Sequence, residues 1–119
     1  MMRRMKLHLS DAQLGLQETS RYEQQIAENA TQINLVQYLQ NYINNPLNKD
    51  EVIPANVGLQ DQNLANIINQ YNTMVVARKR PLRTSSQSNP AVINLNAGID
   101  VMRTTVQTTV NSVLNGLYI

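Results

Sequence analysis

RTSSQSNP, residues 83–90, is the stretch of this sequence that decides its fold. It is polar, and it ends in a signal for the start of a helix. Pro90 suits the first helical position because its φ is fixed and its missing N–H would be unpaired there anyway, and Ser88 or Asn89 can cap the free N–H groups that follow. Apolar residues recur at spacings of three and four on both sides of the stretch, which predicts an apolar stripe on each of two helices. A connection this short makes the two helices antiparallel.

The sequence thus predicts a long helical hairpin, with helices over residues 60–81 and 90–117. Its core is expected to contain the stripe residues Ile67, Ile68, Tyr71, Val75, Leu95, Ile99, Met102 and Val106. Asp61 is expected in the first turn of the first helix, where a negative charge complements the helix dipole. Pro81 removes a backbone hydrogen bond and its ring crowds the preceding turn, so the first helix is expected to kink or end there.

A third long helix is expected over residues 11–44, packed along the hairpin. Ser10 is its expected N-cap, and residues 1–9 are expected to fray as a chain terminus. Its apolar stripe contains Tyr22, Ile26, Ala30, Ile33, Val36 and Ile43, which indicates burial along most of its length. The overall prediction is an all-α fold, with residues 1–119 forming a single helical domain.

Residues 46–58 form the one long loop that the sequence predicts. Such a length is unusual between helices of a bundle, so the loop is either functional or held in place by its own side chains. The apolar residues Val52, Ile53 and Val57 favour the second interpretation.

Several stretches of the chain carry a resemblance to a known family. They are residues 38–43, 52–59 and 69–72, then Arg78, and finally Asn89-Pro90 followed by Val92, Leu95, Ile99 and Met102. In this order they resemble the periplasmic helical region of bacterial polysaccharide co-polymerases, the chain-length determinant family. The match is with the Wzc-type capsular-polysaccharide tyrosine autokinases in the form met in Bacteroidetes. The resemblance covers roughly residues 10–113, which is nearly the whole chain.

The resemblance implies a structural role in capsular polysaccharide or exopolysaccharide biosynthesis and export. In that family such segments assemble into rings around the growing polymer, at the periplasmic face of the inner membrane, so self-association and contact with export machinery are implied. Family members also carry two transmembrane helices and a cytoplasmic kinase domain with a tyrosine-rich tail, none of which the sequence shows. We therefore expect an internal segment of a larger membrane protein. The alternative is a generic helical adaptor or coiled-coil module with no link to polysaccharide.

Composition excludes several kinds of chemistry. With one His and no Cys, no metal site is expected, and the four scattered Gly form no phosphate-binding loop, so no cofactor is expected either. No residues fit a catalytic set, and we expect no enzymatic activity of this chain. The net charge of +2 and the absence of Phe and Trp speak against nucleic-acid binding.

One dense basic stretch remains, made of Arg78, Lys79, Arg80 and Arg83. Cations at the end of a helix complement the negative end of its dipole, and this is the interpretation we favour. In the functional interpretation they form a patch that docks an anionic polymer or acidic residues of a neighbouring molecule.

Overall fold

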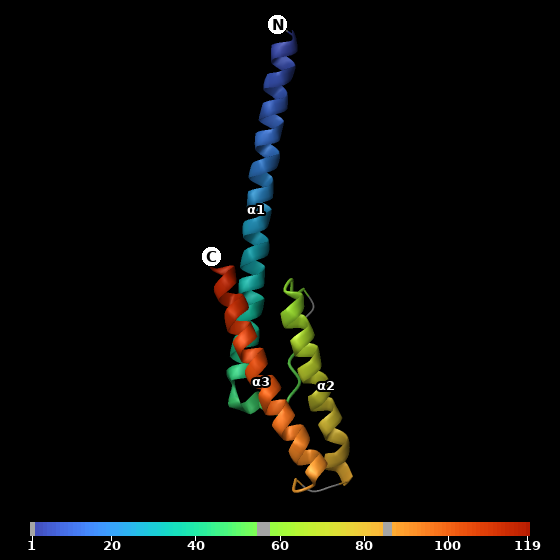
Figure 1. The fold of residues 1–119 in the computed structure, drawn as a ribbon. Helices are drawn as coiled ribbons and strands as arrows, with labels where there is room; N and C mark the ends of the chain where they lie inside the picture. The colour runs from blue at the N-terminus through green and yellow to red at the C-terminus, as the bar shows by residue number, and fades with distance from the viewer. Residues whose placement is uncertain (1, 55–57, 85–86) are drawn as a thin grey trace. The chain divides into compact units, whose positions relative to one another are not determined.

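The computed structural model describes the backbone of residues 2–54, 58–84 and 87–119, and the side chains of residues 15–54, 58–83 and 87–119. Over these residues the protein is all-α, as predicted. The elements are α1 (Met2–Asn44), the short 3-10 helix η1 (Pro46–Asn48), α2 (Gln62–Thr84) and α3 (Pro90–Leu117). The chain divides into two units, residues 1–31 and residues 32–119. The second unit contains the C-terminal part of α1 together with η1, α2 and α3 (Figure 1).

The predicted hairpin is confirmed. α2 and α3 lie side by side and are joined at one end by the turn before Pro90 (Figure 1). At that turn the side-chain Oδ1 of Asn89 accepts a hydrogen bond from the N–H of Ala91 at 2.8 Å, and the carbonyl of Asn89 accepts one from the N–H of Ile93 at 3.0 Å. Asn89 is therefore the N-cap of α3, and Pro90 is its first residue. Ser88 precedes the cap in the turn.

The core follows the apolar stripes of the two hairpin helices. Of the eight residues predicted for it, Ile68, Tyr71, Val75, Ile99 and Val106 are buried, and Ile67, Leu95 and Met102 are half-buried. Each fully buried aliphatic side chain contributes about 1.5–3 kcal/mol relative to an exposed one. This burial has to hold α3 together, because four β-branched Thr between positions 104 and 109 lower its intrinsic helix propensity.

The C-terminal part of α1 completes this core with Val36, Leu39 and Ile43, all of them buried. Beside them, two pairs of amide side chains join α1 to α3. Gln40 Nε2 donates to Asn111 Oδ1 at 2.8 Å, and Gln107 Nε2 donates to Asn44 Oδ1 at 3.3 Å. Since a later residue of α1 pairs with an earlier residue of α3, the two helices run antiparallel here. The prediction that a third helix packs along the hairpin is confirmed for this part.

The N-terminal part of α1 differs from the prediction in two respects. The helix begins at Met2, so Ser10 is not an N-cap and residues 2–9 are helical. Residues 3–9 lack Gly and Pro and include the good helix formers Arg, Met, Lys and Leu, so no local signal stops the helix before Ser10. Second, Tyr22, Ile26 and Ala30 are exposed, as are all residues from 15 to 31. The apolar stripe is thus exposed over its first half, half-buried at Ile33, and buried at Val36 and Ile43.

The bounds of α2 also differ from the prediction at both ends. Asp61 lies before the helix and caps it, because its Oδ1 accepts a hydrogen bond from the N–H of Leu64 at 2.9 Å. A carboxylate serves the helix N-terminus equally well at this position. At the other end, α2 passes through Pro81 and continues to Thr84. Pro81 removes the hydrogen bond that an N–H at this position would donate to the carbonyl of Ala77, but only three helical residues follow it.

The loop after η1 is held in place, although mostly by amide groups of the helices. Ile53 is buried, whereas Val52 is exposed, and Val57 lies outside the described residues. Asn72 in α2 makes two hydrogen bonds with the backbone of Ile53: Oδ1 accepts from the N–H at 2.8 Å, and Nδ2 donates to the carbonyl at 2.9 Å. Gln32 in α1 holds the loop at a second place. Its side-chain amide donates to the carbonyl of Gly58 at 2.7 Å and accepts from the N–H of Gln60 at 3.1 Å.

Candidate interaction site

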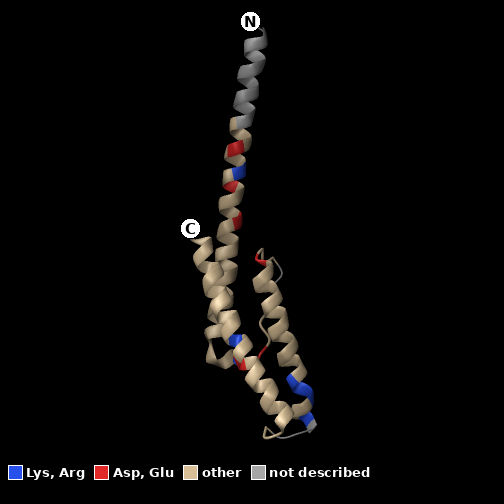
Figure 2. Ribbon diagram, viewed as in Figure 1, with Lys and Arg blue, Asp and Glu red and all other residues tan. Residues whose placement is uncertain are grey.

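The structure divides the predicted basic patch into two parts. Lys79, Arg80 and Arg83 are exposed on the last turns of α2, where Figure 2 shows the cations gathered at the end of the hairpin. Arg78 differs, since only 12% of its side chain is exposed. It turns toward the loop and α3, where it bonds to Asp50 and Asn96, so it is not a solvated helix end.

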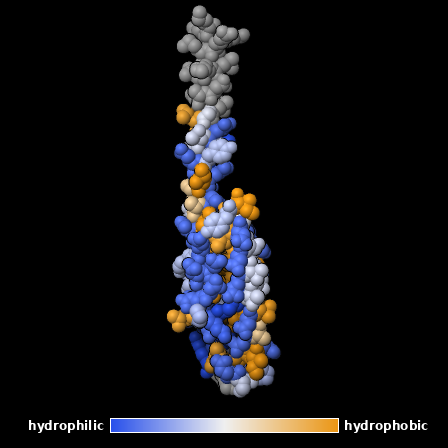
Figure 3. Space-filling model, turned by 90° about the vertical axis from the view of Figure 1, so that its left-hand side faces the viewer, coloured by the Kyte–Doolittle hydropathy of each residue, from blue (hydrophilic) through white to orange (hydrophobic). Residues whose placement is uncertain are grey.

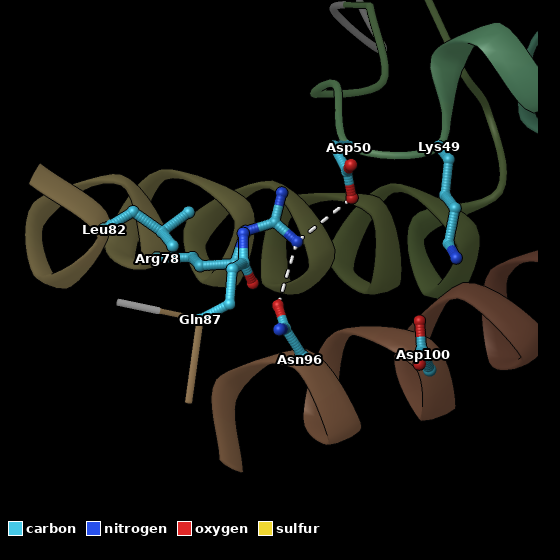
Figure 4. A pocket seen from close by; sticks show the side chains of 7 residues that line it. All are labelled: Lys49, Asp50, Arg78, Leu82, Gln87, Asn96 and Asp100. Atoms are coloured by element: carbon cyan, nitrogen blue, oxygen red, sulfur yellow. Dashed lines mark hydrogen bonds and ion pairs between the residues drawn. The ribbon is translucent and has the colours of Figure 1, made fainter. Parts of the chain in front are cut away.

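Arg78 joins three segments of the chain through one nitrogen. Its Nη1 donates to Oδ1 of Asp50 in the loop and to Oδ1 of Asn96 in α3, both at 3.1 Å (Figure 4). Its Nε is buried and has no hydrogen-bond partner among the described residues. A guanidinium carries five N–H donors in a rigid fork, so this one keeps donor capacity after both bonds are made.

A cavity of about 300 Å³ opens beside Arg78, between the loop, α2 and α3. It is lined by Lys49, Asp50, Arg78, Leu82, Gln87, Asn96 and Asp100 (Figure 4). Six of these seven side chains are polar or charged, and only Leu82 is apolar. In Figure 4 the Lys49 side chain points from the loop toward α3, and the Asp100 carboxylate points from α3 toward the loop. Within the described part of the chain, the one side-chain ion pair is that between Arg78 and Asp50.

A second polar cluster lies further along the hairpin and fixes the position of Lys49. Arg103 Nη2 donates to the hydroxyl of the buried Tyr71 at 2.6 Å, and the guanidinium carbon lies 5.6 Å from the centre of the Tyr71 ring. The Tyr71 hydroxyl in turn donates to the carbonyl of Lys49 at 3.2 Å. This chain of contacts holds the loop backbone next to the cavity, while the Lys49 side chain stays exposed.

Sequence reasoning found Arg78 but not its role, named Asn72 only within the stretch 69–72 that carries the resemblance, and missed Gln32, Asn96 and Arg103. One signal was available for Gln32. It occupies the register of the buried residues Val36, Leu39 and Ile43 at helical spacing, and a polar residue at a core position must find a hydrogen-bond partner. The partner itself, Gly58, is 26 positions away, and no local pattern identifies it.

The described residues hold no group of three or more His, Cys, Asp or Glu side chains that could bind a metal ion. Among them, no helix is apolar over a stretch long enough to cross a membrane. No family model, curated protein or solved structure matches this chain.

Proposed function

We propose that this chain is a structural segment of a polysaccharide co-polymerase, which organises the assembly and export of a capsular polysaccharide or exopolysaccharide. The observation that supports the proposal is the place in the fold of the residues that carry the resemblance. Asn72 holds Ile53, Arg78 bonds to Asn96, and Asn89 caps α3. The resemblance therefore includes the residues on which the hairpin and its loop depend, and not only an apolar spacing that many helices share.

In this function the segment acts through contacts with other copies of itself. Tyr22 and Ile26 are 68% and 69% exposed and lie four residues apart, on one face of α1. A helix that exposes an apolar stripe to water gains stability from a partner that covers it. The partner we propose is another copy in a ring, at the periplasmic face of the inner membrane, next to the export machinery. Kinase activity and membrane anchoring belong to other parts of the larger protein.

The second candidate is a helical adaptor unrelated to polysaccharide. The same exposed stripe favours it, because any amphipathic partner helix could cover Tyr22 and Ile26. The gene neighbourhood separates the two candidates: glycosyltransferase and polysaccharide-exporter genes are expected beside the gene for a co-polymerase, and have no reason to lie beside an adaptor gene.

The direct test measures polysaccharide length in cells. Ile99→Asp, which places a carboxylate in the hairpin core, is introduced into the full-length protein, and the polymer is sized by electrophoresis. We expect shortened or absent polymer, because a buried unpaired charge disrupts the hairpin. Ile93→Asp is the matched control, since Ile93 lies in the same helix but is 51% exposed. Polymer of normal length with Ile99→Asp, in cells that hold normal amounts of the protein, would contradict the proposal.

A further inference from the structure

The cavity beside Arg78 has a chemistry that selects one class of ligand. It contains two cationic side chains, Lys49 and Arg78, and two anionic ones, Asp50 and Asp100. Arg78 and Asp50 already neutralise each other at 3.1 Å, and the side chains of Lys49 and Asp100 point toward each other (Figure 4). A cavity with no net formal charge offers little to a free anion or cation, because each attractive charge has a repulsive one beside it.

The lining offers hydrogen-bond donors and acceptors in close alternation. Carboxylates only accept, ammonium and guanidinium groups only donate, and the amides of Gln87 and Asn96 do both. A hydroxyl group donates and accepts at once, so it can bridge a neighbouring carboxylate and cation. An apolar ligand would lose these interactions, whereas a ligand with several hydroxyls reproduces the bonds of the water that it displaces. Leu82 supplies one apolar wall, against which C–H groups can pack.

The size of the cavity limits the ligand to about one ring. Sites for small molecules span roughly 300–1,000 Å³, and this cavity of about 300 Å³ is at the lower end of that range. It is also preformed, because the Arg78 bonds to Asp50 and Asn96 fix the loop against the hairpin, and the Tyr71 hydroxyl holds the backbone of Lys49. A preformed site has a lower entropic cost of ligand binding.

We propose that this cavity binds an uncharged, polyhydroxylated ligand the size of a single sugar residue. Its hydroxyls bind to Lys49, Asp100, Asn96, Gln87 and the guanidinium of Arg78. That such a residue belongs to a polymer rests on the proposed function, whereas binding of a free monosaccharide depends on the cavity alone.

The experiment titrates the isotope-labelled 119-residue chain with glucose, galactose and N-acetylglucosamine and follows the backbone amide resonances by NMR. Acetate and sulfate are the anion probes. We expect at least one sugar, at concentrations of roughly 1–50 mM, to shift the amides of Asp50, Gln87, Asn96 and Asp100 in a saturable manner. Neither anion should do so.

The test variant is Lys49→Gln/Asp100→Asn, which removes one cation and one anion and keeps the net charge. Both side chains are exposed, so the fold should be retained. Binding is expected to weaken at least about tenfold, because two charge-assisted hydrogen bonds become neutral ones. The matched control Lys79→Gln/Glu51→Gln makes the same change in charge outside the cavity lining, and should bind like the parent chain.

Three outcomes would overturn the inference: no sugar shifts these amides, the test variant binds as tightly as the parent, or an anion binds more tightly than every sugar. Self-association is measured on the same samples by sedimentation. If association persists while sugar binding is absent, the cavity inference fails and the proposed assembly role stands.

Discussion

Ile99 illustrates how strongly the hairpin depends on single side chains. It is 1% exposed and belongs to the core cluster shared by α1, α2 and α3. Ile99→Ala should lower the free energy of unfolding by about 2–5 kcal/mol, because it removes buried methyl groups and leaves a cavity. Ile93→Ala in the same helix, at a position 51% exposed, should change it by less than about 0.5 kcal/mol. Urea unfolding measures both, and equal midpoints for the two variants would place Ile99 outside the core.

Substitution of Arg78 tests whether it differs in role from the exposed cations Lys79, Arg80 and Arg83. Arg78→Gln removes the bonds to Asp50 and Asn96 and should destabilise the chain by about 1–2 kcal/mol, a value reduced from the buried case because Asp50 is 65% exposed. Lys79→Gln, which removes the same charge from an exposed side chain, should have an effect of less than about 0.5 kcal/mol. Thermal unfolding compares them. Indistinguishable melting curves would restore the interpretation of all four cations as dipole complements.

Tyr42 should make the free energy of unfolding depend on pH in the alkaline range. Partial desolvation of its hydroxyl, followed by the nearby charges of Glu51, Tyr38 and Tyr71, raises the pKa of Tyr42 above its ordinary value of 10.0. The unfolded chain then releases this proton at a lower pH than the folded chain does. The contribution is therefore fully present below about pH 10 and is lost as the pH rises through the folded pKa.

The measurement is the slope of unfolding free energy against pH between about 9 and 11. Tyr42→Phe should make this slope less negative than in the parent chain. It should also lower stability at neutral pH, because the hydroxyl donates to the carbonyl of Val52 at 2.9 Å, so slopes and not absolute values are compared. A slope unchanged by the substitution would remove Tyr42 from the alkaline transition.

At the level of whole elements, local signals predicted the start of α3 well and the ends of the other helices less well. Asn89-Pro90 works because a cap and a fixed φ act within one turn, whatever surrounds them. Ser10 also looks like a cap, but a cap residue only permits a helix to begin and does not prevent it from starting earlier. Pro81 looked like a stop for a similar reason. It removes one hydrogen bond of α2, but only three helical residues follow it, so the helix does not end there.

Pro81 should nevertheless still cost stability. Pro81→Ala restores an N–H to α2 and is expected to stabilise the chain by about 1–2 kcal/mol, which is less than the interior value of about 3 because the site is near the helix end and the unfolded chain gains freedom. Arg80→Ala, one residue away and exposed, is the control for helix propensity alone. Chemical unfolding provides the comparison. A Pro81→Ala chain less stable than the parent would show that the ring makes contacts worth more than the missing bond.

The elements of the candidate site were the least predictable from sequence. Periodicity identifies which face of a helix is buried, but Asn72 reaches a loop residue 19 positions away, and Arg78 reaches Asp50 across 28. The geometry of a loop decides these pairs, and loop geometry follows from contacts that form only after the helices have packed. The cavity lined by Lys49, Asp50 and Asp100 exists because of those contacts, so no motif in the sequence predicts it.

At the scale of the whole molecule, the surface offers two ways for copies of the chain to associate: through exposed charges and through exposed apolar side chains. Figure 3 shows that hydrophilic side chains cover most of one face, with apolar groups in small, separate patches. The three cations at the end of α2 would favour contact with carboxylates of another copy, but single exposed ion pairs contribute only about 0–1 kcal/mol each. The exposed Tyr22 and Ile26 can contribute more, because covering apolar area yields about 25 cal/mol per Å².

Salt therefore distinguishes which surface carries self-association. Exposed charges are screened over roughly 10 Å at 0.1 M salt, whereas apolar contacts are not weakened in this way. Tyr22→Gln/Ile26→Gln keeps good helix propensity and should weaken association of the chain at every salt concentration. Lys79→Gln/Arg80→Gln/Arg83→Gln should weaken it only at low salt, and Arg78 is left in place because it holds the loop.

Val76→Gln, at an apolar position of α2 that is 56% exposed, is the control for a general loss of apolar surface. Sedimentation velocity across a salt series measures all of them. If Val76→Gln abolishes association as completely as the double variant, then the stripe of α1 has no special role, and if the parent chain stays monomeric throughout, then association through either surface is excluded.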